Sequence, residues 1–332
     1  MYNRRMKKKH KKFLKFGAGI IIFVALFSIW FLGIHSHVRV DTTFDIGRGA
    51  SVAGVAADLK SQKLIGFERP FKLLVRAFGG NVKRGMYDIP RGASVWRIAR
   101  IMSDGRVATT TIMIPEGLTV RQIIALLNAN QFLTGDSCPP RNPICYAEGE
   151  LFPNTYIVAK GTSRAAVLDL MRREMQRIEK NWIESGMRAP PPLKNWNEII
   201  TLASIVQKET PKKAEMPKVA SVFINRLRKG MRLQADPTVV YAITDGLGDM
   251  QGKPILTRHL QTSHPHNTYM NHGLPPHPIA SVGRDAIRSV LNPADTNYYF
   301  FVADGTGGHV FAKDYEQHKI NHANWRIIRS QK

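Results

Sequence analysis

An uncharged run near the amino terminus constrains this chain more than any other feature. Residues 16–34 read FGAGIIIFVALFSIWFLGI, 19 residues without a charged side chain. A helix of about 20 apolar residues spans the hydrocarbon core of a bilayer. Residues 1–15 carry eight Lys and Arg, and no acidic residue occurs in the first forty positions. The positive-inside rule therefore predicts a cytoplasmic basic tail at 1–15 and a single transmembrane helix at 16–34 of the inner (cytoplasmic) membrane.

The chain after about His37 is then expected on the periplasmic, or extracytoplasmic, side of that membrane. A cleaved signal peptide is the alternative interpretation. The apolar run is longer than the core of a signal peptide, and no small-x-small cleavage site follows it. We therefore predict an uncleaved membrane anchor.

The charge balance bears on the partners of the exported part. The formal net charge is +23, and about +15 remains when the eight charges of the basic tail are set aside. Such an excess fits nucleic acid, but an exported domain does not usually meet it. Anionic wall polymer or lipid headgroups fit the predicted location better. A surface kept soluble by Lys and Arg explains the charge equally well.

Two cysteines, Cys138 and Cys145, flank the proline-rich segment CPPRNPIC. The exported side of a membrane is oxidising, which favours a local disulfide over two free thiols. Two thiolates with no His between them do not make a metal site. We predict a structural disulfide and no metal.

A pattern of short strand, glycine turn and capped helix occurs three times before residue 130. Each copy starts with TTFDI, GMYDI or TTIMI, in which every second residue is apolar or β-branched, as in a half-buried strand. A Gly follows, and then a Ser or Thr whose hydroxyl can cap a helix. The glycines are Gly49, Gly92 and Gly117, and the capping residues are Ser51, Ser94 and Thr119.

The copies are spaced too irregularly for a solenoid, so we predict small α+β modules over residues 38–147. The pattern resembles a LysM-type glycan-binding module. Ordinary helix capping is the alternative explanation.

Helices are expected to dominate residues 148–332. Apolar periodicity predicts helices at 166–185, 196–209 and 218–229, and a short helix starting near Ser281. The tail from 298 predicts two strands, a Gly-rich turn and a closing helix. The expected fold class is α+β, with an amino-terminal transmembrane helix, a LysM-like module and a mainly helical catalytic domain with short strands.

Glu209 is an acidic residue at a position where an amphipathic helix would carry an apolar one. Leu202, Val206 and Glu209 are spaced i, i+4 and i+7, so the carboxyl group is expected to continue a buried stripe. Desolvation disfavours the charged form of a carboxyl group, which should therefore hold its proton near neutral pH. The spacing makes Glu209 a candidate general acid.

The order of longer motifs over residues 16–325 resembles the endolytic murein transglycosylase family, the MltG or YceG-like proteins. Besides the anchor and the LysM-like segment, the matching motifs are IPEGLTV at 114–120, EGELFPNTY at 148–156, ASIVQKET at 203–210, VASVFINRLRKGMRLQADPTVVY at 219–241, HNTYMNHGLPPHPI at 266–279 and YYFFVADGTGGHVF at 298–311.

The resemblance implies an endolytic lytic transglycosylase. Such enzymes cut nascent peptidoglycan strands between N-acetylmuramic acid and N-acetylglucosamine and leave a 1,6-anhydromuramyl end. Glu209 matches the family's catalytic glutamate, the second acid of an E-K-E motif. Three positions depart from the family pattern. Gln207 stands in place of the first acid of that motif, Asn154 stands where an Asp is usual, and His277 stands where a Gly is usual.

The expected chemistry needs a single carboxyl group. It protonates the glycosidic oxygen and then, as carboxylate, takes the proton of the muramyl C6 hydroxyl. Ordinary glycosidases use two carboxylates instead. Glu148 and Asp236 are the candidates for a second one; we expect Glu148 in the cleft and Asp236 in a turn before Pro237, which leaves hydrolysis open.

Further polar residues near these motifs are candidate substrate-binding groups, although each has a structural alternative such as bracing a helix or filling the core. They are Glu148, Asn225, Arg226, Gln234, Asp236, Asn267, Thr268 and Tyr269. Arg226 suits a muramyl or stem-peptide carboxylate, or a surface ion pair.

Five histidines between 259 and 277 suggest a zinc site at first sight. No H-E-x-x-H helix accompanies them, and a solvated loop explains them equally well. We predict no metal and no cofactor.

Two other functions remain open: a noncatalytic peptidoglycan-binding wall protein and a hydrolytic muramidase. The expected partners are peptidoglycan strands, the membrane through the amino-terminal helix and, from the family, peptidoglycan synthases. Nucleic acid is not expected.

Overall fold

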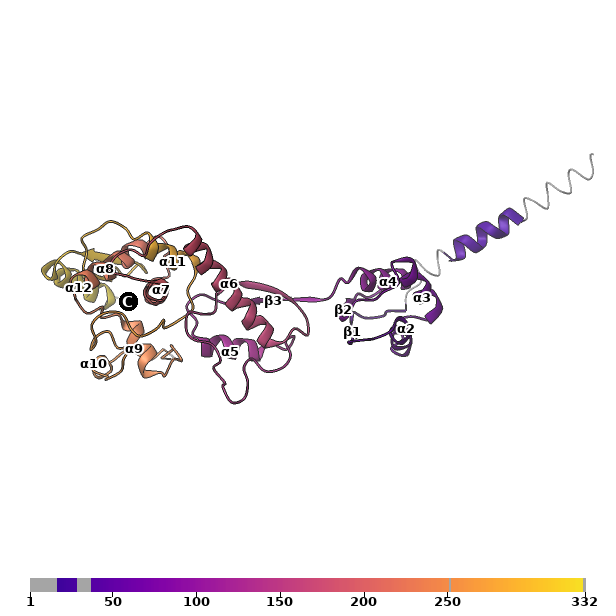
Figure 1. The fold of residues 1–332 in the computed structure, drawn as a ribbon, viewed down its shortest axis with the longest axis horizontal. Coiled ribbons are helices and arrows are strands. Elements are labelled where there is room, and N and C mark those ends of the chain that lie inside the picture. Colours follow the sequence, from indigo (N-terminus) through magenta and orange to yellow (C-terminus); the bar gives the residue numbers. More distant parts are fainter. Residues whose placement is uncertain (1–16, 29–36, 251, 331–332) are drawn as a thin grey trace, which may run out of the picture. The chain divides into compact units, whose positions relative to one another are not determined.

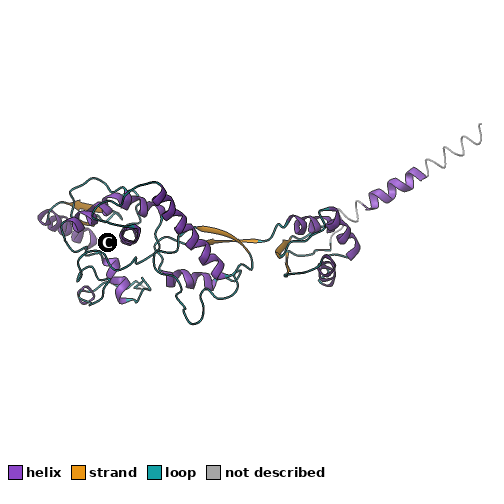
Figure 2. Ribbon diagram, viewed as in Figure 1, coloured by secondary structure: helices purple, strands orange, loops and turns teal. Residues whose placement is uncertain are grey.

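The computed structural model describes residues 17–28, 37–250 and 252–330. Two compact units emerge, the first formed by Met1–Thr110 with Val158–Gly161 and the second by Thr111–Ile157 with Thr162–Lys332. Helices outnumber strands (Figure 2), and the mixture agrees with the predicted α+β class. The third copy of the strand-turn-helix pattern belongs mainly to the second unit.

No helix in the described ranges is both long and apolar enough to cross a membrane. Residues 17–28 are helical, but residues 16 and 29–34 of the predicted span lie outside the described part of the chain, as does the basic tail. The anchor stays a prediction.

The first unit pairs two strands and packs helices against them. Strand β1 (Thr42–Ile46) runs antiparallel to β2 (Gly85–Ile89), with Phe44 opposite Tyr87. Both aromatic side chains are buried in a core completed by helices α2 (Val52–Ser61), α3 (Glu68–Ala77) and α4 (Val95–Asp104). The likeness to a LysM module stays a prediction.

The predicted helix caps are confirmed. The hydroxyl groups of Ser51, Ser94 and Thr119 accept backbone hydrogen bonds in the first turns of α2, α4 and α5 (Val120–Ala129), respectively. The glycine two positions before each cap has a positive φ, between 74° and 79°. Glycine adopts this conformation without steric cost, which explains why the motif carries it.

Strands β3 (Thr109–Met113) and β4 (Thr155–Ala159) form a second two-stranded sheet. The predicted tail hairpin is also confirmed: β5 (Phe300–Ala303) pairs antiparallel with β6 (His309–Ala312), and α12 (Tyr315–Ser330) follows.

Helix α7 (Trp196–Glu209) occupies the core of the second unit. Its middle residues Ile199, Leu202, Ala203 and Val206 have no exposed surface. It packs against α8 (Met216–Arg228) and α11 (Arg284–Leu291), as Figure 1 shows, and also against α9 (Asp236–Ile243). The remaining helices of the unit are α6 (Arg164–Glu184) and the short α10 (Thr257–Leu260).

Helix α9 was not predicted. Asp236 was expected in a turn, but it is the first residue of this helix, and Pro237 follows in the first turn. Proline suits that place because a first-turn N–H has no partner within the helix.

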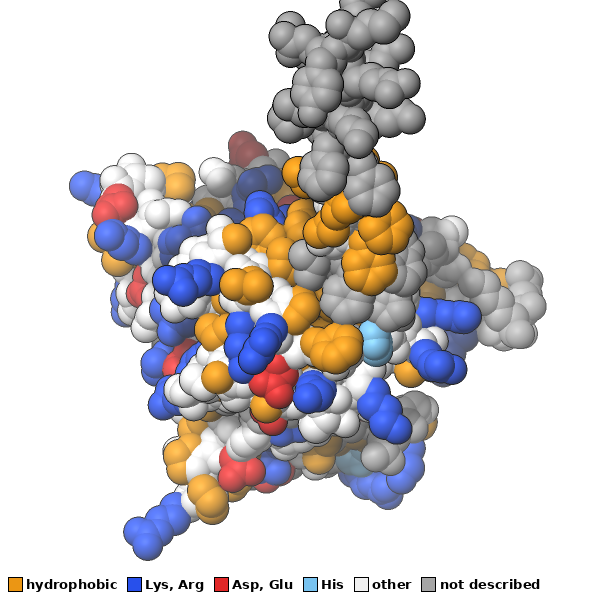
Figure 3. Space-filling model, turned by 90° about the vertical axis from the view of Figure 1, so that its right-hand side faces the viewer, with side chains coloured by type: hydrophobic (Ala, Val, Ile, Leu, Met, Phe, Trp, Pro, Cys, Tyr) orange, Lys and Arg blue, Asp and Glu red, His pale blue; other side chains and the backbone are white. Residues whose placement is uncertain are grey.

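Lys and Arg side chains are scattered over the face of the molecule drawn in Figure 3, with few Asp and Glu side chains between them. On this face the positive charge is spread out. It does not mark one binding patch.

Candidate active site

Glu209 is the last residue of α7, one turn beyond the buried Val206. The expectation that it would be buried like Leu202 and Val206 is only partly met, because Glu209 is half-buried. The helix ends here, so the carboxyl group emerges from the core at a surface. A proton donor at this place is both shielded and reachable.

Burial raises the pKa of the Glu209 carboxyl to about 8. The negative charge of Asp236 contributes to this rise, and the Arg226 guanidinium opposes it, so that the value of about 8 is the result of all three. A position at the carboxyl end of a helix also disfavours a negative charge, because the unpaired carbonyl oxygens there carry partial negative charge. Glu209 therefore holds a proton at neutral pH.

Asp236 and Tyr269 form a hydrogen-bonded pair near Glu209. The Tyr269 hydroxyl donates to Asp236 Oδ1 at 2.6 Å. Burial, this hydrogen bond and the charges of Asp236 and Glu209 raise the pKa of Tyr269, so its hydroxyl stays protonated. Asp236 is exposed at the start of α9.

Arg226 is 8% exposed and brings a positive charge to the same place from α8. Its guanidinium donates to the carbonyl oxygens of Tyr299 and Leu233 at 2.6 and 2.7 Å. Its charge acts on both Glu209 and Tyr269. We call Glu209, Asp236, Tyr269 and Arg226 the Glu209 cluster.

Asn225 uses its side-chain amide within the protein. Its Nδ2 donates to the carbonyl oxygens of Thr296 and Tyr298 at 2.8 and 3.1 Å. These bonds tie α8 to the segment that leads into β5. The structure thus gives Asn225 a bracing contact.

Asn267 and Thr268 are fully buried beside the Glu209 cluster. Asn267 Nδ2 donates to the carbonyl oxygens of Leu260 and Thr262, and Asn267 Oδ1 accepts from the backbone N–H of Tyr269. These contacts hold Tyr269 in place.

Thr268 and Gln234 lie where the 267–269 loop meets the start of α9. Thr268 Oγ1 accepts from the N–H of Ala235 at 3.0 Å. Gln234 is exposed, and its φ of 50° belongs to the left-handed region. Of the two side chains, only that of Gln234 faces solvent.

Glu148 lies in the loop before β4, and its carboxyl group contacts the first residue of α5. Both of its carboxyl oxygens accept from the N–H of Val120, at 3.0 and 3.1 Å. Burial raises its pKa to about 7, against the lowering effects of the Val120 hydrogen bond and of Arg121. The structure therefore contains a second carboxyl group that titrates near neutrality.

Glu148 lines a cavity of about 380 Å³. Arg121 and Tyr241 also line it, and the sequence motifs did not single them out. Tyr241 ends the QADPTVVY motif. Nothing in that motif distinguishes Tyr241 as a residue that lines a cavity.

The three departures from the family pattern have local contacts. Gln207 Oε1 accepts from the N–H of Gly283 at 3.0 Å, which joins α7 to the start of α11. Asn154 Oδ1 accepts from the N–H of Thr155. His277 Nδ1 lies 2.9 Å from the carbonyl oxygen of Pro278.

No group of three or more His, Cys, Asp or Glu side chains suited to a metal ion occurs in the part of the chain that the structure describes. The histidines between 259 and 277 do not all lie in a solvated loop, because His266 is only 4% exposed. His266 and His277 contact each other, and His272 lies against the carbonyl oxygen of Gly230.

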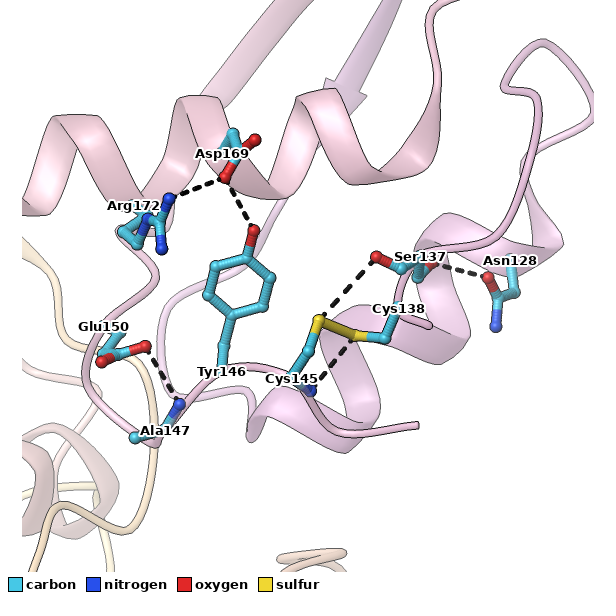
Figure 4. The surroundings of a disulfide bond; sticks show 9 residues. All are labelled: Asn128, Ser137, Cys138, Cys145, Tyr146, Ala147, Glu150, Asp169 and Arg172. Atoms are coloured by element: carbon cyan, nitrogen blue, oxygen red, sulfur yellow. Dashed lines mark hydrogen bonds and ion pairs between the residues drawn. A yellow bond between two sulfur atoms is a disulfide. The ribbon is translucent and has the colours of Figure 1, made fainter. Parts of the chain in front are cut away.

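Cys138 and Cys145 form a disulfide in the segment before Glu148 (Figure 4). In the same segment, the hydroxyl of Tyr146 donates to Asp169 on α6 at 2.9 Å. Both contacts limit the motion of the loop that carries Glu148.

Comparison with known proteins places these residues in a family context. Residues 44–324 match the model of the YceG-like family. A Bacillus subtilis protein named endolytic murein transglycosylase is 29% identical over 328 aligned residues, which cover 90% of this chain and 88% of that protein.

A Streptococcus pneumoniae protein of the same name is 26% identical, and the alignment covers 89% of this chain but 61% of the relative. The chain thus spans about three-fifths of that relative. Among solved structures, a yceG-like protein of Listeria monocytogenes is similar, with a TM-score of 0.49, 27% identity, and coverage of 85% of this chain and 99% of that one.

Proposed function

The chain belongs to the YceG-like family, and from that premise we propose that it is a peptidoglycan lytic transglycosylase that cuts glycan strands internally. The relatives named endolytic murein transglycosylase support this activity. The proposed bond is the β-1,4 linkage between N-acetylmuramic acid and N-acetylglucosamine in nascent strands. The proposed product carries a 1,6-anhydromuramyl end.

The observation that carries the proposal is a half-buried carboxyl group, Glu209, whose pKa is about 8. Such a group is protonated at neutral pH and can donate its proton to the glycosidic oxygen as the bond to C1 breaks. The resulting carboxylate then takes the proton of the muramyl C6 hydroxyl while that oxygen closes on C1. The proton count balances, and no water is consumed.

The neighbours of Glu209 suit the charges of this reaction. The sugar ring gains positive charge as the bond breaks, and the Asp236 carboxylate lies near enough to act on Glu209 electrostatically. Its hydrogen bond from Tyr269 fixes its position. A fixed negative charge near a developing cation lowers the barrier.

The Asp236 carboxylate near Glu209 also favours a second candidate function, a hydrolytic muramidase. An inverting or retaining hydrolase pairs its acid with another carboxylate. Asp236 is the acidic side chain that acts on Glu209. In that case Asp236 would activate a water or form the covalent intermediate.

A noncatalytic wall-binding protein is the remaining alternative. It requires a glycan-binding surface but no proton donor. The raised pKa of Glu209 then has no role.

We place the reaction outside the cytoplasm, on a chain held in the inner membrane by residues 16–34, with residues 1–15 in the cytoplasm. The support is the uncharged run and the basic flank before it. Nascent strands and the synthases that extend them would be met at that surface.

Mass spectrometry of digested peptidoglycan tests the proposal. The wild-type chain should release fragments with 1,6-anhydromuramyl ends, and Glu209→Gln should release none. Glu184→Gln, the same change on the exposed end of α6, serves as the control and should retain activity. Reducing muramic acid ends would identify the hydrolase, and a wild-type chain that binds glycan without cutting it would identify the wall-binding protein.

A further inference from the structure

The cavity beside Glu148 is not used by the proposed reaction. Its volume is about 380 Å³, and all of its lining residues belong to the second unit. The lining residues include Arg121, Glu148, Tyr241, His266 and His277. We call this cavity the tyrosine–histidine pocket.

One wall of the tyrosine–histidine pocket is aromatic. The ring centroids of Tyr241 and His266 are 4.9 Å apart, and those of His266 and His277 are 4.1 Å apart. Burial lowers the pKa of His266 to about 4, so its ring is uncharged at neutral pH. The rings of Tyr241 and His266 therefore offer an uncharged aromatic surface suited to the apolar face of a ring-shaped ligand.

The tautomers of the two histidines follow from their contacts. His277 Nδ1 lies 2.9 Å from the Pro278 carbonyl oxygen, which can only accept a hydrogen bond. His277 Nδ1 therefore carries the hydrogen, and His266 Nε2, 3.1 Å away, must act as an acceptor. This network fixes both rings, so the aromatic wall exists before any ligand binds.

The pocket is also lined by polar groups, those of Glu148 and Arg121. The Glu148 carboxyl is fixed by the Val120 N–H and can bond to ligand hydroxyl or amide groups. Arg121 pairs with Asp245 at 3.0 Å, but the Asp245 side chain is 92% exposed. An ion pair so open to solvent contributes little, so an anionic group of a ligand can replace Asp245 as the partner of Arg121.

Helix α9 connects this pocket to the Glu209 cluster. Asp236 is its first residue, and Tyr241 lies five residues later. At a rise of 1.5 Å per residue, the two positions are about 7.5 Å apart along the helix axis. One rigid element therefore supplies a side chain to each site.

We propose that the tyrosine–histidine pocket is a subsite for a second sugar of the glycan strand, and that Arg121 recognises an acidic substituent on it. The inference rests on the proposed function: the substrate of an enzyme that cuts strands internally extends beyond the two sugars at the cleaved bond. The aromatic wall binds the face of an N-acetylhexosamine ring, Glu148 binds its hydroxyl or amide hydrogens, and Arg121 binds a stem-peptide carboxylate. The pocket thus sets the position of the strand relative to Glu209.

Binding is best measured in the Glu209→Gln background, where the strand is not consumed. Three ligands distinguish the parts of the proposal: glycan strands with their stem peptides, the same strands with the stems removed, and N-acetylglucosamine oligomers. Arg121→Gln should weaken binding of the strands with stems about three- to tenfold, equivalent to about 0.7–1.4 kcal/mol, and leave binding of the uncharged N-acetylglucosamine oligomers unaffected. Strands without stems keep the lactyl carboxylate of N-acetylmuramic acid, and an equal loss of affinity for them would overturn the assignment of Arg121 to the stem peptide. Tyr241→Leu should weaken binding of all three.

Arg177→Gln is the matched control, because Arg177 also pairs with a carboxylate, Glu174, on a surface outside the pocket. With the active enzyme, Arg121→Gln should raise KM and leave kcat near the wild-type value. If Tyr241→Leu does not fold, as judged by circular dichroism, Arg121→Gln still carries the test.

Unchanged affinity of Arg121→Gln for the strands with stems, or a loss equal to that in Arg177→Gln, would overturn the proposal. That failure is distinct from failure of the proposed function, in which Glu209→Gln would still release products.

Discussion

The hydroxyl of Tyr269 donates a 2.6 Å hydrogen bond to Asp236, which lies 33 residues earlier in the chain. The bond holds the Asp236 carboxylate at the start of α9, where its charge raises the pKa of Glu209. Tyr269, a loop residue, thereby acts through Asp236 on the pKa of Glu209 at the end of α7. The first predictions concern that coupling.

The rate of glycan cleavage should fall above pH 8. Glu209 donates its proton in the first step, and its pKa is about 8. Above that value the protonated fraction falls about tenfold per pH unit, and kcat should follow. Initial rates between pH 6 and 10 measure this alkaline limb of the pH–rate profile. A rate that rises steadily to pH 10 would rule out Glu209 as the acid.

Asp236→Asn should move this alkaline limb to lower pH. The substitution removes a charge that raises the pKa of Glu209 and keeps an oxygen for the Tyr269 hydrogen bond. Comparison of the two pH profiles gives the shift. A profile with the same alkaline limb would mean that the Asp236 charge does not act on the catalytic proton.

The same substitution bears on the lyase and hydrolase alternatives. If Asp236 activates water or forms the covalent intermediate, Asp236→Asn should abolish cleavage at every pH. A displaced but active profile favours the lyase.

The stability that Glu209 and Glu148 contribute should fall as the pH rises from about 4.5 to 8, opposed below about pH 6.5 by His266, whose pKa is lowered to about 4. The ordinary pKa of a glutamate is 4.5, whereas the folded chain holds Glu209 at about 8 and Glu148 at about 7. Between these limits the folded state keeps protons that the unfolded state has released, so the contribution is complete below pH 4.5 and is lost through pH 8. Unfolding temperatures across this range measure the slope.

Glu209→Gln has no proton to lose and should reduce that slope, leaving the part that Glu148 contributes up to about pH 7. Glu184→Gln, at an exposed position, should leave it unchanged. Equal slopes in wild type and Glu209→Gln would contradict the raised pKa.

Replacing both cysteines by serine should lower the free energy of unfolding of the second unit by about 2 kcal/mol. The disulfide closes a loop with a sequence separation of 7, and a short loop removes a modest amount of entropy from the unfolded chain. Calorimetry of the double variant, compared with the oxidised wild type, measures the loss. Cleavage at 25 °C should continue, because neither cysteine belongs to the Glu209 cluster.

Asn225→Ala should destabilise the chain by about 1–3 kcal/mol, because it leaves the carbonyl oxygens of Thr296 and Tyr298 without their donor. Asn225→Asp should cost more, since it places an acceptor against two acceptors. KM of the folded protein should stay near the wild-type value. A large rise in KM without loss of stability would instead indicate a substrate contact.

Local signals in the sequence determined the elements of this protein. The apolar spacing of α7, the Ser and Thr caps and the glycine turns act within a few residues, so a helix or strand follows wherever they occur. Helix α9, which was missed, begins with Asp236 and Pro237, and these two residues indicate a turn as readily as a helix start.

Only the tertiary structure decided the chemistry of the site. Periodicity placed Glu209 on the buried stripe, but its partial exposure depends on where α7 ends in the core. Its pKa depends on Asp236 and Arg226, which come from other helices. Distances between such residues arise from packing and not from spacing along the chain, and electrostatic energy depends on those distances.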